Sequence, residues 1–135
     1  MLTKDDMLVA LHDAITEDQE FELADEIVDA MEASPQPFDL VAPILELIAN
    51  HPEVDFGSPG ELVHFVEKFY HQGYEDLLLE SVLKSPTVHN IWMLHRCFND
   101  NDPNLVRQIQ ILVGELKKDK TLDSQVRSMI EDLTW

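Results

Sequence analysis

The sequence is short of cysteine and of long apolar runs, and each shortage excludes a class of protein. Cys97 is the single cysteine among 135 residues, so no internal disulfide can form and an oxidising compartment is not indicated. No apolar run approaches the roughly 18 residues of a membrane-spanning helix, and the start of the chain lacks the features of a signal peptide. We therefore expect a cytoplasmic protein without membrane contact, in which Cys97 is a small core side chain.

Glycine is also scarce, which argues against several kinds of active site. The chain has four glycines, and none lies in a phosphate-binding loop or on the sharp turn that presents a catalytic Ser or Cys. Carboxylates are abundant, but no sequence feature picks out a pair with the opposed environments that acid and base roles need. We therefore expect no enzymatic activity.

Histidine spacing gives weak grounds for a metal site. Glu61 and His64, like Glu67 and His71, are spaced so that two ligands could share one helical face. Carboxylate-bridged di-iron bundles use the Glu-x-x-His motif twice, whereas this sequence contains it once, at Glu61. We therefore predict no metal and no cofactor.

Basic residues are few, and they are distributed unevenly. Nine Lys and Arg stand against 27 Asp and Glu, a formal net charge of −18. Residues 1–61 contain 16 acids and one base, Lys4, a net charge of −15, whereas residues 62–135 contain 11 acids and eight bases, a net charge of −3. Such a field repels nucleic acids and anionic membranes and attracts basic proteins. A basic protein is therefore the expected partner, and nucleic acid is not.

The apolar residues, which make up 44% of the chain, follow a helical period, and no stretch alternates as a strand does. Prolines at 35, 59, 86 and 103 mark breaks, because proline cannot continue a helix. This pattern predicts an all-α protein of eight helices, at about residues 3–14, 18–33, 38–50, 59–72, 74–83, 87–99, 103–118 and 122–133.

Polar residues before several of these segments predict helix caps. Thr3 is suited to cap the first helix, and Asp102 precedes Pro103 at the start of the seventh. The run from Ser58 to Glu61 predicts a capping box, with Ser58 as the cap and Pro59 as the first helical residue. Residues 100–102 are expected to form the turn before the seventh helix.

Short turns between the predicted helices favour antiparallel hairpins. Stacked hairpins build an α-solenoid of the HEAT-like kind, which is the architecture that we predict. A compact helical bundle is the alternative. Residues 1–135 are expected to form a single all-helical domain that is a monomer when unbound.

The strongest candidate site is a row of carboxylates on the second predicted helix. Its members follow the spacing i, i+3, i+4, i+7, i+10 on the side opposite the apolar face, and no basic residue relieves their mutual repulsion. A face that only solvates the protein is the alternative. We predict that this row binds the partner: Glu22, Asp25, Glu26, Asp29 and Glu32.

The sixth predicted helix supplies a second candidate surface. Ile91, Leu94 and Phe98 are expected to face the core, which leaves the tryptophan, histidine and arginine of this helix on other sides. This composition is typical of anchors in protein interfaces. We predict that Trp92, His95 and Arg96 contact the partner, the alternative being that Trp92 packs between neighbouring hairpins.

The chain resembles the small all-helical immunity proteins of bacterial contact-dependent growth inhibition and related polymorphic toxin systems. The resemblance lies in its length, its acidic balance and the segment from Ser85 to Asp100, which reads SPTVHNIWMLHRCFND. It implies a cytoplasmic protein that binds a cognate toxin domain, often a basic nuclease, and blocks its active site or substrate groove. The alternative is an acidic helical-repeat adaptor or a DNA-mimic protein that binds a basic cellular factor.

Overall fold

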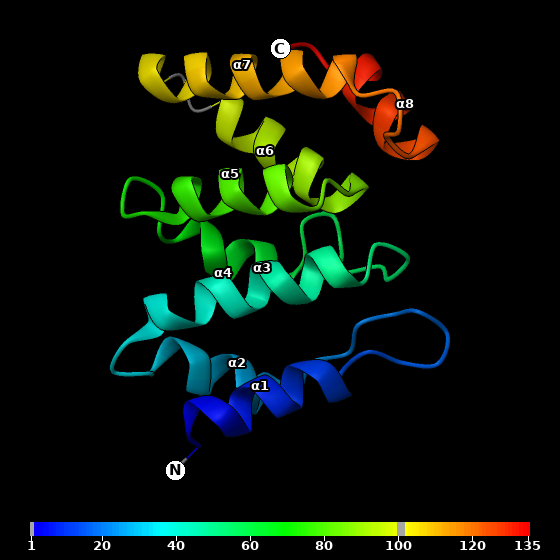
Figure 1. Cartoon of the computed structure of the whole chain (residues 1–135). Helices are drawn as coiled ribbons and strands as arrows, with labels where there is room; N and C mark the ends of the chain where they lie inside the picture. The colour runs from blue at the N-terminus through cyan, green and yellow to red at the C-terminus, as the bar shows by residue number, and fades with distance from the viewer. Residues whose placement is uncertain (1, 100–101) are drawn as a thin grey trace. The chain divides into compact units, whose positions relative to one another are not determined.

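A computed structural model of the chain describes residues 2–99 and 102–135. Within these residues all regular elements are helical, and the only strand-like pairings are two isolated bridges (Figure 1). The expected all-α class is therefore confirmed. The elements are α1 (Lys4–Asp13), α2 (Asp25–Glu32), the 3-10 helix η1 (Pro37–Leu40), α3 (Val41–Asn50), α4 (Glu61–Glu67), α5 (Tyr74–Lys84), α6 (Val88–Phe98), α7 (Pro103–Lys118) and α8 (Ser124–Asp132).

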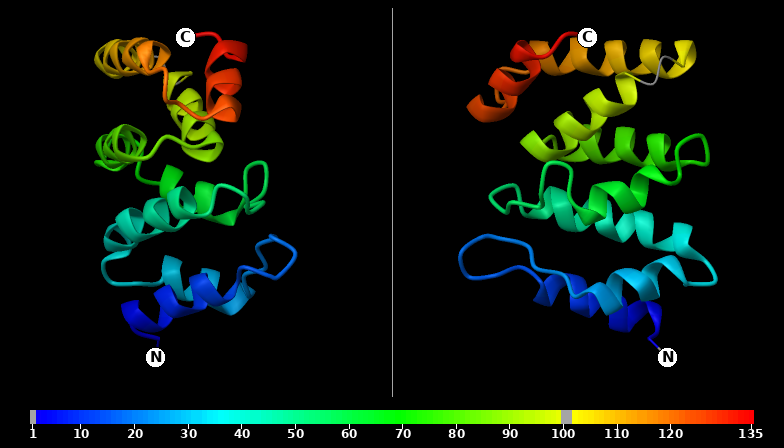
Figure 2. Two further views of the ribbon diagram at one scale, coloured as in Figure 1. Left: turned by 45° about the vertical axis from the view of Figure 1, so that its right-hand side comes forward. Right: turned by 180° about the vertical axis from the view of Figure 1, so that it is seen from behind.

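The chain divides into two compact units, Met1–Tyr74 and Glu75–Trp135. In the N-terminal unit α1 packs against α2, α2 against η1, and α3 against both η1 and α4. In the C-terminal unit α6, α7 and α8 pack against one another, as two further views show (Figure 2). No helix of the described residues is long and apolar enough to cross a membrane.

The core of the N-terminal unit is centred on α3. Because its apolar residues recur at helical spacing, they lie on an inward face, and each buried side chain contributes roughly 1.5–3 kcal/mol. Five residues at this spacing, Leu40 at the end of η1 and four of α3, are buried: Leu40, Val41, Ile44, Leu45 and Ile48.

The core of the C-terminal unit comes from one face of each of its last three helices. Cys97 is 1% exposed on α6, which confirms its expected core role. Phe98, which was expected to face the core, is only half-buried at the end of that helix. The buried residues of this core include Ile91, Met93 and Leu94 of α6, Leu105, Ile109 and Val113 of α7, and Val126 and Ile130 of α8.

Two of the predicted helix caps are confirmed. The Thr3 Oγ1 accepts from the Asp6 N–H at 3.1 Å, and the Asp6 carboxylate accepts from the Thr3 N–H at 2.9 Å. The hydrogen bond of this carboxylate with the Thr3 backbone, and secondly that with the Thr3 side chain, hold the pKa of Asp6 below its ordinary value. Before α7, Asp102 accepts from the N–H groups of Asn104 and Leu105. The rest of the turn expected there, residues 100 and 101, lies outside the described residues.

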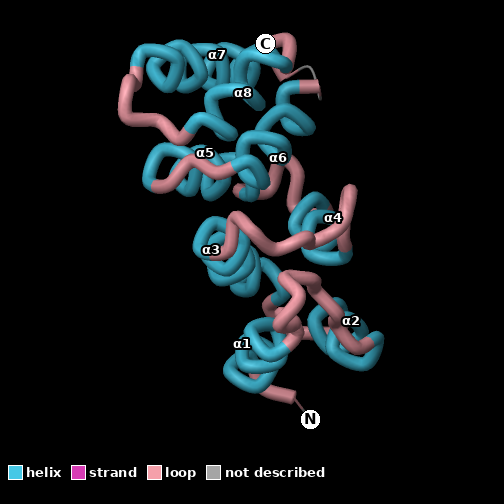
Figure 3. Tube along the Cα trace, turned by 90° about the vertical axis from the view of Figure 1, so that its right-hand side faces the viewer, coloured by secondary structure: helices cyan, strands magenta, loops and turns pink. Residues whose placement is uncertain are grey.

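The second predicted helix is wrong in its first half, because α2 begins at Asp25 rather than near residue 18. The tube between α1 and α2 is accordingly drawn as loop (Figure 3). Residues 14–24 form a loop in which the Thr16 N–H donates to the Glu20 carbonyl at 2.8 Å. Gln19 has a φ of 63°, in the left-handed region that helices avoid. An antiparallel bridge joins Ile15 to Phe21, and these contacts replace the expected helical hydrogen bonds.

The predicted cap at Ser58 is also wrong. The N-cap of α4 is Gly60, whose carbonyl accepts from the His64 N–H at 3.1 Å, and no side chain caps this helix. Ser58 and Pro59 lie outside the helix, and the peptide bond between them is cis. A capping box over these residues does not form, because Glu61 is the first residue of α4 rather than the third.

The fourth helix is shorter than the sequence predicts, since α4 ends at Glu67. Beyond it the Phe69 N–H donates to the Val66 carbonyl at 3.0 Å, three residues back rather than four. His71 then has a φ of 65°, which stops further helical growth before Gly73.

Candidate functional site

The acidic row predicted on the second helix is split between a loop and α2. Glu22 lies in the extended segment before α2, where its N–H donates to the Ala14 carbonyl at 2.9 Å. The row on one helix therefore has four members, not five. All five carboxylate residues are exposed: Glu22, Asp25, Glu26, Asp29 and Glu32.

One member of this row is neutralised within the chain. The Glu32 carboxylate lies 2.6 Å from the Lys68 Nζ, with both side chains about half exposed. Lys68 also lies 5.9 Å from the centre of the Phe65 ring. The repulsion in the row is thus partly relieved by a lysine from beyond residue 61, which the local sequence did not indicate.

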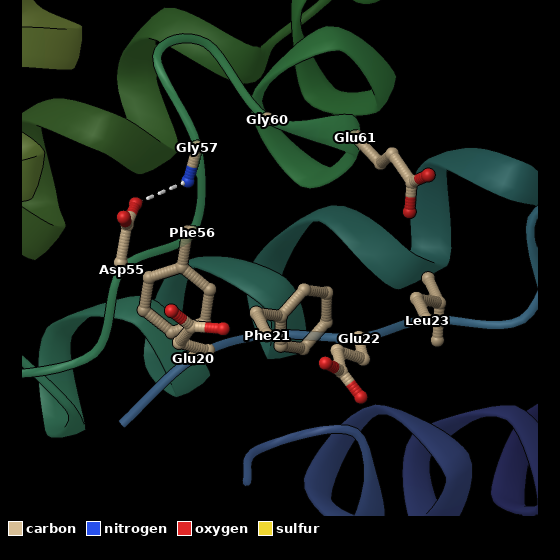
Figure 4. A pocket seen from close by; sticks show the side chains of 9 residues that line it. All are labelled: Glu20, Phe21, Glu22, Leu23, Asp55, Phe56, Gly57, Gly60 and Glu61. Atoms are coloured by element: carbon tan, nitrogen blue, oxygen red, sulfur yellow. Dashed lines mark hydrogen bonds between the residues drawn. The ribbon is translucent and has the colours of Figure 1, made fainter. Parts of the chain in front are cut away.

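Glu22 instead belongs to a pocket of about 400 Å³ in the N-terminal unit. One wall is the extended segment 20–23, and the other is the loop that leads from Asp55 to the start of α4 (Figure 4). The lining residues are Glu20, Phe21, Glu22, Leu23, Asp55, Phe56, Gly57, Gly60 and Glu61.

Backbone pairing brings the two walls together. A parallel bridge joins Glu20 to Asp55, and the Asp55 N–H donates to the Gln19 carbonyl at 2.9 Å. The rings of Phe21 and Phe56 lie 5.2 Å apart between centres, tilted by 53°. Phe21, which falls within the predicted second helix, thus packs against a ring from the second wall instead.

The loop on the second wall is tightly folded. The Gly57 N–H donates to the Asp55 Oδ1 at 2.9 Å, and Gly57 has a φ of 104°, a conformation that favours glycine. A Cβ on Gly60 would lie 1.5 Å from the Phe56 carbonyl oxygen. Both glycines are therefore required for the backbone to turn at this point.

The pocket is strongly acidic. Four carboxylates line it, from Glu20, Glu22, Asp55 and Glu61, and its lining contains no basic residue. Asp55 accepts the Gly57 hydrogen bond, whereas the other three side chains make no hydrogen bond or ion pair within residues 2–99 and 102–135. The arrangement can attract a cation and repel an anion.

The second candidate surface, on α6, is in the C-terminal unit and only half-buried. The Arg96 guanidinium lies 5.1 Å from the centre of the Trp92 ring, which is a cation–π distance. The His95 Nε2 lies 3.0 Å from the Thr134 carbonyl oxygen, and the ring lies edge-on to Trp135 at 5.0 Å. Trp92 is thus not fully buried, and His95 is held by the end of the chain.

No histidine is among the residues that line the acidic pocket. His51 Nδ1 lies 2.8 Å from the Leu47 carbonyl oxygen, and its ring contacts that of His12. Among the described residues no three His, Cys, Asp or Glu side chains are grouped so as to hold a metal ion.

The pocket itself was not predicted, although the sequence of each of its two walls has an unusual local feature. Asp55-Phe56-Gly57 is a turn-forming sequence, and Phe21 stands among acids. No local rule pairs two segments that lie more than 30 residues apart, so the sequence did not bring them together.

Comparison of the chain with protein-family models, with curated proteins and with solved structures found no match.

Proposed function

We propose that the chain binds a basic partner protein through the acidic surface of its N-terminal unit, as an immunity protein that neutralises a cognate toxin domain. The charge of this unit carries the proposal. Residues 1–74 contain 17 acids and two bases, a net charge of −15, and the candidate carboxylates are exposed. A field of this strength speeds association with a basic protein.

The mechanism in this proposal is electrostatic and steric. Carboxylates of α2 occupy the positions at which a nuclease holds phosphates, and the bulk of the chain excludes the substrate. Trp92 and Arg96 are proposed to slow dissociation, since half-buried aromatic and arginine side chains make interface anchors. His95 is proposed to support them from its contact with Trp135.

The proposal is tested first by growth protection. A toxin domain encoded beside this chain is expressed with and without it, and the two proteins are purified together. Rescue with a stable complex supports immunity. Failure with every neighbouring toxin contradicts it and favours an acidic adaptor or DNA-mimic protein that binds a basic cellular factor.

The role of α2 is tested by neutralising its carboxylates and measuring the association rate with that partner. At low salt the triple variant Asp25→Asn, Glu26→Gln, Asp29→Asn is expected to associate about tenfold more slowly, because steering depends on charge near the interface. The matched control removes three exposed charges of the C-terminal unit, with Glu80→Gln, Glu131→Gln and Asp132→Asn. Equal slowing by both variants would mean that only net charge matters.

We also propose that successive helices form the hairpins of a HEAT-like α-solenoid. The packing of α1 on α2 and of α3 on α4 supports this architecture. Small-angle X-ray scattering tests it, since a solenoid has an elongated distance distribution and a compact bundle has a symmetric one.

A further inference from the structure

The acidic pocket differs from the α2 carboxylates in that its charges surround a hollow. Glu20 and Glu22 come from one wall, and Asp55 and Glu61 from the other (Figure 4). The four carboxylates of α2 are not part of its lining. The pocket is therefore a second acidic feature of the same unit, with a shape that can enclose part of a ligand.

The floor of the pocket is aromatic and apolar. Phe56 is 6% exposed, Phe21 is half-buried beside it, and Leu23 continues the same wall. Carboxylates around aromatic rings suit a flat cation that stacks on a ring while donating several hydrogen bonds. An arginine guanidinium has both properties, whereas the lysine ammonium is a compact, strongly hydrated charge.

The pocket is also preformed. Its walls are held by the hydrogen bond from Asp55 to Gln19 and by that from Gly57 to Asp55, so little ordering remains when a ligand binds. A volume of about 400 Å³ lies in the lower part of the range for ligand pockets, roughly 300–1,000 Å³. It has room for one long side chain together with water.

We propose that this pocket receives an arginine side chain of the partner protein. The inference rests on the proposed function and adds to it a defined contact. The guanidinium stacks on Phe21 and donates hydrogen bonds to the carboxylates of Glu22 and Glu61, which have no partner within the described residues.

The proposal is tested without the partner by titrating the ¹⁵N-labelled chain with Nα-acetyl-arginine amide and recording amide chemical shifts. The largest shifts are expected at residues 20–23 and 55–61. The corresponding lysine amide is expected to bind roughly threefold more weakly, because it lacks the planar stacking surface. Shifts spread evenly over the acidic residues, or equal affinity for both probes, would overturn the proposal, as would tight binding of calcium chloride at the same residues.

A pair of matched variants separates the pocket from the general charge. Glu22→Gln with Glu61→Gln is expected to weaken arginine-amide binding about tenfold, since two charge-assisted hydrogen bonds are lost. Glu26→Gln with Asp29→Asn removes the same number of charges outside the pocket. This pair is expected to change the affinity for the arginine amide by less than about twofold. Equal effects of the two pairs would overturn the pocket assignment.

Phe21→Leu tests the aromatic floor. It is expected to abolish the preference for the arginine probe over the lysine probe while the amide spectrum stays that of a folded chain. A preference that survives in the folded variant would show that the ring takes no part.

The two proposals can fail separately. If the α2 variants slow association with a basic partner but the arginine probe does not bind the pocket, the proposed function stands and the pocket assignment falls. If the probe binds the pocket but no basic partner is found, the pocket assignment stands and the proposed function falls.

Discussion

At the scale of single residues, Gly60 shows how tightly the backbone of the loop that lines the pocket folds back on itself. A Cβ at this position would lie 1.5 Å from the Phe56 carbonyl oxygen and 2.7 Å from its carbonyl carbon. These are backbone atoms, which cannot turn aside as the end of a flexible side chain does. Gly114, on α7, has nothing within 4 Å of the corresponding position.

Gly60→Ala is therefore expected to lower the free energy of unfolding by at least about 2 kcal/mol, because the loop must shift to admit a methyl group. The matched control Gly114→Ala is expected to raise it by about 0.5–1 kcal/mol, since alanine favours a helix interior. Urea denaturation followed by circular dichroism measures both. A Gly60 variant as stable as the natural chain would contradict the tight loop.

At the scale of the elements, the helices differ in how their first turns are capped. Thr87 caps α6 with its hydroxyl, which accepts from the Asn90 N–H at 3.2 Å, and the Asn90 side chain accepts from the Thr87 N–H at 2.8 Å. The Asn90 amide also donates to the Ser85 carbonyl at 2.8 Å. Both Thr87 and Asn90 are buried, whereas the equivalent box at Thr3 is exposed.

Thr87→Ala is expected to cost about 1–2 kcal/mol of unfolding free energy, because it leaves a buried N–H of α6 without its acceptor. Thr3→Ala is the matched control and is expected to cost about 0.5–1 kcal/mol, since water can replace the lost hydroxyl there. Urea denaturation of the two variants compares them. A larger loss at Thr3 than at Thr87 would show that burial of the cap does not govern its contribution.

At the scale of the whole molecule, the charge is concentrated in one unit. Residues 1–74 carry a net charge of −15, whereas residues 75–135, with 10 acids and seven bases, carry −3. Self-repulsion of like charges destabilises a compact unit, and dissolved salt screens it. The two units should therefore respond differently to ionic strength.

Raising sodium chloride from about 0.01 M to about 0.1 M shortens the screening length from about 30 Å to about 10 Å. Amide hydrogen exchange is expected to slow more in residues 2–74 than in residues 75–135, because screening relieves more repulsion in the first unit. Exchange measured by NMR at both salt concentrations tests this. An equal change in both units would mean that local pairs such as Lys68 with Glu32 already offset the repulsion.

The predicted features that are confirmed depend on neighbours within about one helical turn. The helix α3 and the caps at Thr3 and Asp102 are of this kind, since helical spacing and side-chain capping act between residues three or four apart. The cap predicted at Ser58 is wrong because the backbone makes a tight turn at Gly57 and Gly60, and the helix therefore begins only at Glu61. The binding roles assigned to the acidic row and to α6 stay predictions.

Periodicity and composition can be read directly along the chain, so they were enough to predict the all-α class and the concentration of acidic charge in the first half. That residues 18–24 lie outside α2, and that an acidic pocket forms beside them, depends on contacts between distant parts of the chain. Phe21 and Glu20 meet Phe56 and Asp55 from a distant part of the chain. The ring contact and the backbone hydrogen bonds of this pairing override the helical preference of the acidic segment. No local sequence pattern encodes a pairing between segments so far apart in the chain.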